Sequence, residues 1–279
     1  MPGAASPVGS VTRGTTNTNR LRRVDRWIAT LGSLRTAPAP LVVDLGYGAS
    51  GITALEMHRR LRATRPDVRV VGIEIEPGRV ARAREQLATW PDAEARERIS
   101  FVRGGFEVPL PGGERATVIR AFNVLRQYDE AEVPAAWARM AARLAPGGSV
   151  VEGTCDEIGR VASWIDVRED GPRSLTISLR LAGLELPSIV AERLPKALIH
   201  RNVPGERVHE VLALLDRSWI LSAPLGVYGP RQQWLGAVRR MRDAGVPVEG
   251  GHARWRLGEL TVPWSAVAPG ADAGAARGA

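Results

Sequence analysis

The chain has 279 residues, a net charge of +8 and a hydrophobic fraction of 44%. This length suits one α/β domain with additions, and no apolar run reaches the roughly 18 residues that a membrane-spanning helix needs. A single cysteine, Cys155, excludes an intramolecular disulfide and every multi-cysteine zinc pattern, and we expect no metal site. The first ten residues lack the apolar core of a secretory signal, so we expect a cytoplasmic protein with no membrane partner.

The positive charge has two interpretations. Lys196 is the only lysine, so the basic residues are nearly all arginine and are spread along the chain. A basic protein is a candidate for nucleic-acid binding. An arginine-rich and alanine-rich composition can equally reflect the composition of the source genome. The sequence leaves both interpretations open.

The N-terminal region is expected to be disordered over residues 1–14, which are small, polar and rich in Pro and Gly. An amphipathic helix follows, with apolar residues at helical spacing from Leu21 to Leu31 and arginines on the remaining positions. These arginines either form a solvated face or belong to an arm beside the functional site. In the second interpretation, Arg20 and Arg23 contact an anionic substrate.

The stretch around which the chain is organised is LVVDLGYGASG, residues 41–51. Leu41–Val43 predict a short buried strand, the glycines predict a tight turn, and a helix begins near Ile52. Glycines let a ligand approach the backbone, and the free N–H groups of a helix start favour anionic groups. This pattern alone is weak evidence for a nucleotide-like ligand.

Further strands are predicted at residues 68–73, 99–102, 116–121 and 149–154, with helices between them. Alternating strands and helices predict a doubly wound, mostly parallel sheet. Glu74 ends the second strand, 23 positions after Gly51, where an acid that binds a ribose is expected.

Together, VDLGYGASG, GIEIEP and LAPGGSVV resemble the class I S-adenosylmethionine (SAM)-dependent methyltransferases over residues 41–154. The resemblance implies a Rossmann-like fold and SAM as cofactor. A nicotinamide-dependent oxidoreductase is the rival, because its glycine spacing is similar. Asp44 before the glycines and the Pro-Gly-Gly turn at 146–148 favour SAM. The residues expected to bind the cofactor are Asp44, Gly46, Tyr47, Gly48, Gly51, Glu74, Ile75, Gly105, Phe106 and Asn123.

The chain departs from the family after the third strand, where an acid often accepts a hydrogen bond from the adenine amino group. Gly104, Gly105 and Phe106 occupy that place. Either the backbone and stacking on Phe106 hold the adenine, or Glu107 substitutes for the acid.

The methyl acceptor is expected after the fourth strand, because ligands bind at the carboxyl ends of parallel strands. We expect catalytic roles for Asn123 and Tyr128, and substrate contacts from Arg126, Arg20 and Arg23. Glu152 is a further candidate for a base on the ligand side. The acceptor is unknown, with a small molecule favoured over RNA. The alternative function is a noncatalytic SAM- or RNA-binding module on the same fold.

The C-terminal part is expected to add an antiparallel hairpin over residues 161–181, helices at 206–220 and 231–244, and a short final strand. We expect a single SAM-binding domain over residues 15–264 and a disordered tail over 265–279. The oligomeric state is left open.

Overall fold

The computed structural model describes residues 6–15 and 17–270. The chain divides into two compact units, one of residues 1–159 and 167–171 and the other of residues 160–166 and 172–279. From the sequence we expect one domain over residues 15–264. The division arises because the C-terminal residues pack around a core of their own.

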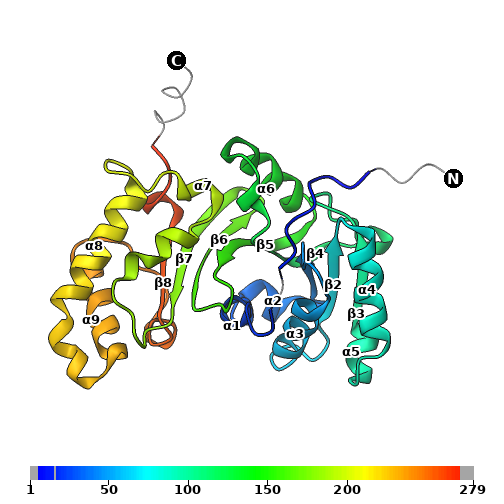
Figure 1. The fold of residues 1–279 in the computed structure, drawn as a ribbon, viewed down its shortest axis with the longest axis horizontal. Helices are drawn as coiled ribbons and strands as arrows, with labels where there is room; N and C mark the ends of the chain where they lie inside the picture. Colours follow the sequence, from blue (N-terminus) through cyan, green and yellow to red (C-terminus); the bar gives the residue numbers. More distant parts are fainter. Residues whose placement is uncertain (1–5, 16, 271–279) are drawn as a thin grey trace, which may run out of the picture. The chain divides into compact units, whose positions relative to one another are not determined.

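The first unit is built on parallel strands in the order β3-β2-β1-β4-β5, with β1 and β4 at the centre (Figure 1). The strands are β1 (Leu41–Leu45), β2 (Arg69–Glu74), β3 (Ile99–Arg103), β4 (Ala116–Phe122) and β5 (Leu144–Cys155). The order reverses between β1 and β4, and in open α/β sheets this is the place where ligands bind, beyond the carboxyl ends of the strands.

Helices cover both faces of these strands. They are α1 (Arg22–Ile28), α2 (Gly32–Thr36), α3 (Ile52–Leu61), α4 (Pro77–Ala88), α5 (Ala93–Arg98) and α6 (Val133–Ala141). In Figure 1, α1, α2 and α3 lie together below the strands, and α6 lies above them. The predicted strands of this region are present. The largest difference is in β5, which begins at Leu144 and not at the predicted residue 149, so it includes the Pro-Gly-Gly stretch expected as a turn.

The second unit contains strands in the order β6-β7-β8, except for residues 167–171 around the β6–β7 turn, which belong to the first unit. Its elements are β6 (Val161–Arg168), β7 (Gly171–Leu179), α7 (Lys196–Ile199), α8 (Arg207–Leu221), α9 (Pro230–Asp243), α10 (His252–Trp255) and β8 (Glu259–Pro263). A two-residue turn joins β6 to β7, and β8 runs antiparallel to β7. Trp219 and Trp234 lie in the core between α8 and α9, with ring centroids 6.4 Å apart.

The expected fold class, a doubly wound and mostly parallel sheet with an antiparallel C-terminal hairpin, is confirmed. One detail differs. Alternation along β7 predicts one buried face, but Thr176 and Ser178 are as buried as Ile177. Thr176 satisfies its hydroxyl by a 2.9 Å hydrogen bond with Thr261 of β8, and this bond lets a polar side chain lie inside.

The ends of the chain also differ in part from expectation. Residues 8–14, within the segment expected to be disordered, make specific contacts with other parts of the first unit. Trp264–Ala266 form a short 3₁₀ turn at the start of the expected tail. The rest of both expected disordered segments, residues 1–5 and 271–279, lies outside the described residues.

Candidate cofactor site

The turn after β1 needs glycine at two positions for its backbone shape. Gly46 and Gly48 have φ values of +69° and +89°, in the left-handed region that other residues avoid. A Cβ atom on Gly46 would also lie 2.6 Å from Val124. The Gly46 N–H donates to the carbonyl of Ile73 at 2.7 Å, and this bond ties the turn to the end of β2.

The third glycine of the pattern serves packing. Gly51, at the start of α3, has an ordinary φ of −69°. A Cβ atom there would lie 2.5 Å from the ring of Phe101 in β3. The Gly51 N–H donates to Gln86 Oε1 at 3.0 Å. Gly51 therefore lets α3 approach β3, and its expected contact with the cofactor stays a prediction.

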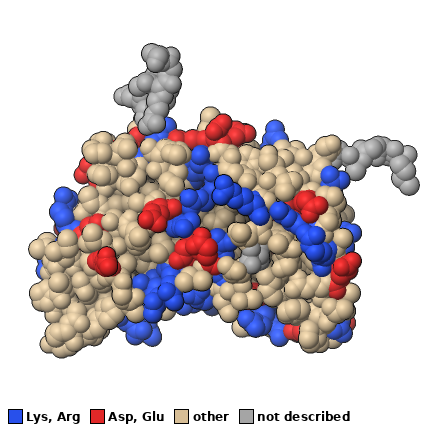
Figure 2. Space-filling view, viewed as in Figure 1, with Lys and Arg blue, Asp and Glu red and all other residues tan. Residues whose placement is uncertain are grey.

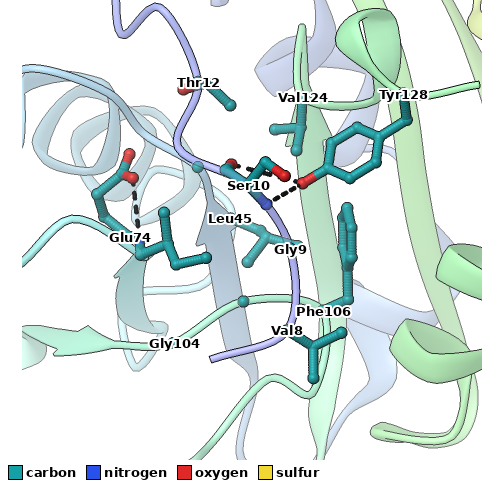
Figure 3. A pocket seen from close by; sticks show the side chains of 13 residues that line it. Val8, Gly9, Ser10, Thr12, Leu45, Glu74, Gly104, Phe106, Val124 and Tyr128 are labelled. Atoms are coloured by element: carbon teal, nitrogen blue, oxygen red, sulfur yellow. Dashed lines mark hydrogen bonds between the residues drawn. The ribbon is translucent and has the colours of Figure 1, made fainter. Parts of the chain in front are cut away.

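Glu74 lies at the carboxyl end of β2 with 1% of its surface exposed. Its Oε2 accepts the Gly48 N–H at 3.0 Å, and its Oε1 accepts the Ile75 N–H at 3.0 Å. Arg79 Nη1 lies 3.6 Å from Oε2. The carboxylate is therefore held beside the glycine turn, at the wall of a cavity (Figure 3).

The loop after β3 presents a hydrogen-bond donor and an acceptor side by side. The Gly105 N–H donates to Glu107 Oε1 at 2.8 Å, which fixes the Glu107 carboxylate next to the Phe106 N–H. Phe106 also meets the ring of Tyr128 edge-to-face, with centroids 5.2 Å apart. The Glu107 carboxylate is thus fixed beside Gly104–Phe106, and its role as a substitute for the missing acid stays a prediction.

The cavity between Glu74 and this loop has about 280 Å³ of empty space, part of which is open to solvent. Its volume is limited because the N-terminal segment runs through it (Figure 3). Four residues of that segment line it: Val8, Gly9, Ser10 and Thr12.

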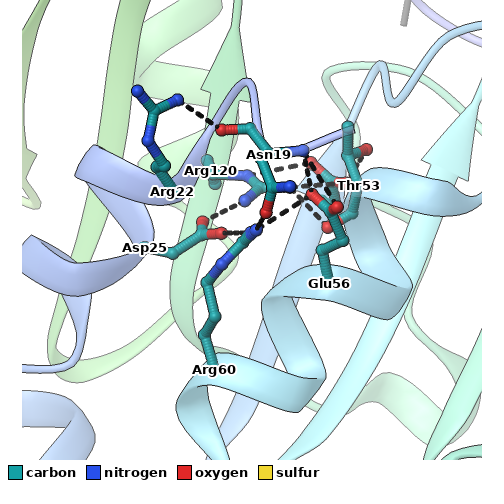
Figure 4. A network of polar contacts seen from close by, with 8 residues as sticks. Asn19, Arg22, Asp25, Thr53, Glu56, Arg60 and Arg120 are labelled. Carbon is teal, nitrogen blue, oxygen red and sulfur yellow. Dashed lines mark hydrogen bonds and ion pairs between the residues drawn. The ribbon is translucent and has the colours of Figure 1, made fainter. Parts of the chain in front are cut away.

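Asp44, at the end of β1, belongs to a buried polar network. Its Oδ2 accepts the Thr53 hydroxyl at 2.7 Å and lies 2.7 Å from Arg120 Nη2. Arg120 also pairs with Asp25 of α1, and Arg60 bonds to the other Asp25 oxygen at 2.6 Å (Figure 4). Asp44 is 2% exposed, and its direct contact with a cofactor stays a prediction.

Asn123, directly after β4, has a left-handed backbone with φ of +58°. Its Oδ1 accepts the Cys155 N–H at 3.0 Å, and its Nδ2 lies 3.4 Å from Cys155 Sγ. Asn123 therefore joins the ends of β4 and β5 where a ligand is expected. Burial raises the pKa of the Cys155 thiol, so it is held in its neutral form.

The arginines predicted to contact the substrate lie near this edge. Arg20 is 8% exposed and donates to the carbonyls of Thr15, Cys155 and Asp156. Arg23 Nε donates to the Gly159 carbonyl at 3.1 Å. Arg126 is half-buried in the 3₁₀ turn Leu125–Gln127. Arg20 thus holds the end of β5 in place, and its contact with a substrate stays a prediction.

Glu152 lies in the core, although we expected it on the ligand side. It has no exposed surface, and burial raises its pKa to about 8, although the Trp137 indole lowers it to a smaller extent. Its position in the middle of β5 is separated from the strand end by Gly153 and Thr154. Sequence order could not reveal to which face of β5 this side chain points.

Within residues 6–15 and 17–270, no helix is long and apolar enough to span a bilayer. The same residues contain no cluster of three or more His, Cys, Asp or Glu suited to a metal ion.

Residues 42–148 match the family described as "Methyltransferase domain". This range begins in β1 and ends in β5, so it contains the glycine turn, Glu74 and the Gly105–Glu107 loop. This part of the chain carries a methyltransferase domain.

No curated protein matches the chain. Among solved structures, the glycopeptide N-methyltransferase MtfA is 23% identical, with 47% of this chain and 51% of that chain covered and a TM-score of 0.37. The CcbJ methyltransferase from Streptomyces caelestis is 19% identical, with coverage of 60% and 72% and a TM-score of 0.40. The O-methyltransferase NcsB1 from neocarzinostatin biosynthesis, solved with SAM and 2-hydroxy-5-methyl naphthoic acid, is 25% identical, with coverage of 45% and 35% and a TM-score of 0.34. This chain therefore spans about half the length of MtfA.

Proposed function

We propose that this protein transfers the methyl group of SAM to an acceptor bound beside Asn123 and Tyr128. The observation that carries the proposal is the set of cofactor-binding groups around the cavity. Glu74 lies on one side of the glycine turn, and the Phe106–Glu107 donor–acceptor pair lies across the cavity.

These groups fit the polar parts of SAM. The Glu74 carboxylate suits two ribose hydroxyls, because a charged acceptor makes stronger hydrogen bonds than a neutral one. The Phe106 N–H and the Glu107 carboxylate suit an edge that offers one acceptor and one donor, as the adenine edge does. The absence of side chains on Gly46, Gly48 and Gly105 leaves the backbone open to close approach.

When bound, SAM supplies an activated methyl group, so the main task of the protein is alignment. Asn123 is held at the β4 end by its two contacts with Cys155, and we propose that it orients the acceptor. The Tyr128 hydroxyl lies near the same edge and is a candidate to take a proton from an acceptor that must lose one. Arg126, Arg20 and Arg23 are the proposed acceptor contacts.

A small-molecule acceptor is favoured over RNA. On the face seen in Figure 2, acidic side chains stand among the arginines. In addition, the Arg20 and Arg23 guanidinium groups donate to backbone carbonyls of their own unit. The acidic side chains offset part of the positive charge that a phosphate backbone would meet. The carbonyls occupy guanidinium donors that would otherwise be open to phosphate oxygens.

The test is transfer of tritiated methyl groups from SAM to a cell extract, repeated with extract treated with RNase. We expect labelled product in both, recovered in the low-molecular-weight fraction. Loss of label after RNase treatment would point to RNA as the acceptor. Absence of label in every fraction, with SAM still bound, would favour the alternative, a noncatalytic SAM-binding module.

A further inference from the structure

The N-terminal segment crosses the whole candidate cofactor site. Its contacts run in order from the Gly105–Glu107 loop, past Glu74 and Arg79, to the glycine turn (Figure 3). We call residues 8–14 the strap. We infer that the strap occupies the place of SAM and must leave it before SAM binds, so that the protein carries an internal competitor of its own cofactor. This inference rests on the proposed function.

The first contact of the strap uses the same two groups that are proposed to bind the adenine edge. The Val8 N–H donates to Glu107 Oε2 at 2.8 Å, and the Val8 carbonyl accepts the Phe106 N–H at 2.9 Å. The backbone of one residue, Val8, therefore uses both the acceptor and the donor that the loop presents. A bound adenine cannot make the same two hydrogen bonds while Val8 makes them.

The second contact depends on glycine in the loop. A Cβ atom on Gly105 would lie 1.9 Å from the Val8 carbonyl oxygen, so no side chain is tolerated where the strap passes. The strap backbone is thus seated against the backbone of the site. A strap that closed over a bound ligand would leave room for the ligand between Val8 and Gly105, and no such room is present.

The remaining contacts follow the path expected for the ribose and the amino acid end. Arg79 Nη2 donates to the Thr12 carbonyl at 2.8 Å, beside Glu74. The Gly14 carbonyl accepts the Ala49 N–H at 3.0 Å, in the glycine turn itself. These bonds satisfy backbone groups that would otherwise face a ligand.

The strap can leave without unfolding the unit. Its residues Gly9 and Ser10 are exposed, and its contacts are mainly hydrogen bonds made by backbone groups. Segments held in this way open locally at low free-energy cost. The apparent affinity for SAM is then lower than the intrinsic affinity, because only the molecules with a released strap can bind SAM.

The main test is hydrogen exchange of the full chain with and without S-adenosylhomocysteine (SAH), the demethylated product of SAM. We expect SAH to speed exchange of the amides of residues 8–14 and to speed trypsin cleavage after Arg13. Slower exchange of residues 8–14 with SAH would overturn the inference, because it would show the strap closing over the ligand.

A second measurement uses full-chain variants that change only the strap. Gly9 has φ of +130°, and a Cβ atom there would lie 2.9 Å from the Tyr128 hydroxyl, so Gly9→Val should unseat the strap. Val8→Pro removes the N–H that bonds to Glu107. Ser6→Val is the matched control, since Ser6 is exposed and does not line the cavity.

By calorimetry, Gly9→Val and Val8→Pro should bind SAH roughly tenfold tighter than the wild type, and Ser6→Val should match the wild type. Equal affinity in all four proteins would overturn the inference and leave the proposed function intact. No SAH binding by any of them would overturn the proposed function, and the inference with it.

Discussion

The guanidinium of Arg120 lies 2.7 Å from the carboxylate of Asp44, and both side chains are buried. The two residues are register partners on neighbouring strands β4 and β1. Burial acts to lower the pKa of Arg120, but Asp25 and Asp44 raise it by more, so the guanidinium stays charged. The carboxyl end of β1, just before the glycines, is thereby fixed by an ion pair in the core.

Replacing Arg120 by Met should strongly destabilise the protein. The change leaves the carboxylates of Asp25 and Asp44 in the core without their shared partner, which costs about 3–5 kcal/mol in comparable cases. Urea unfolding measures this loss. Arg139→Met, on the exposed side of α6, is the control and should change stability by less than about 0.5 kcal/mol. A similar small change in both variants would show that the buried ion pairs contribute little.

Glu74→Gln should weaken SAM binding roughly tenfold to a hundredfold, because it removes charge-assisted hydrogen bonds worth about 1.5–3 kcal/mol. Calorimetry with SAM and SAH measures the effect. The control is Glu85→Gln, which removes an exposed carboxylate from the same region of the chain. Unchanged SAM affinity in Glu74→Gln, or tighter binding of NADH than of SAM, would contradict the assignment.

Asn123 allows backbone and side-chain effects to be separated. Asn123→Gly keeps a residue that adopts φ of +58° freely, whereas Asn123→Ala adds strain of about 1–2 kcal/mol. The Asn123→Ala variant should therefore have a lower free energy of unfolding in urea than the Asn123→Gly variant. If the side chain orients the acceptor, both variants should lose turnover equally while SAM affinity survives. Full turnover in Asn123→Gly would limit Asn123 to joining β4 and β5.

Glu152 should make stability fall as the pH rises. Burial raises its pKa from 4.5 to about 8 in the folded state. Between these values the unfolded chain loses the proton and the folded chain keeps it, so the free energy of unfolding decreases from about pH 4.5 to pH 8. At about 1.4 kcal/mol per pKa unit, the loss is at most on the order of 5 kcal/mol. Glu152→Gln should lack this component when unfolding is measured at pH 5 and pH 8. Parallel pH profiles for both proteins would show that Glu152 is ionised in the fold.

Local patterns predicted the frame of the first unit well. Apolar runs gave the strands, and the glycines after β1 gave the turn, because burial and positive φ values demand particular residue types. The position of Glu74 followed from the same reasoning, since strand length fixes where the carboxyl end lies.

The polar core was missed, although the sequence carried its signal. Asp25 lies four positions after Leu21 and three before Ile28, on the apolar face of α1. His58 is similarly placed between Ala54 and Leu61 in α3, and it is fully buried. A charged or polar residue at a core position needs a partner. What the sequence could not supply was the partner, because pairing Asp25 with Arg120 requires the register and packing of distant elements.

The strap was missed for a different reason. Its composition is small and polar, which is typical of disorder, and its contacts are mainly backbone hydrogen bonds. Backbone N–H and C=O groups are nearly the same in every residue except proline, so no side-chain pattern predicts these hydrogen bonds.

The packing of Phe101 couples positions that lie far apart in the chain. Its ring lies where a Cβ atom on Gly51 or on Gly72 would fall, at 2.5 and 2.4 Å. The ring of Phe101 thus fills the space that side chains at positions 51 and 72 would otherwise occupy. Position 51 meets the tip of the ring, so a protein with Leu in place of Phe101 gains room for Ala there. Position 72 meets the Cδ1 atom, which Leu keeps, so Gly72 stays restricted in either case.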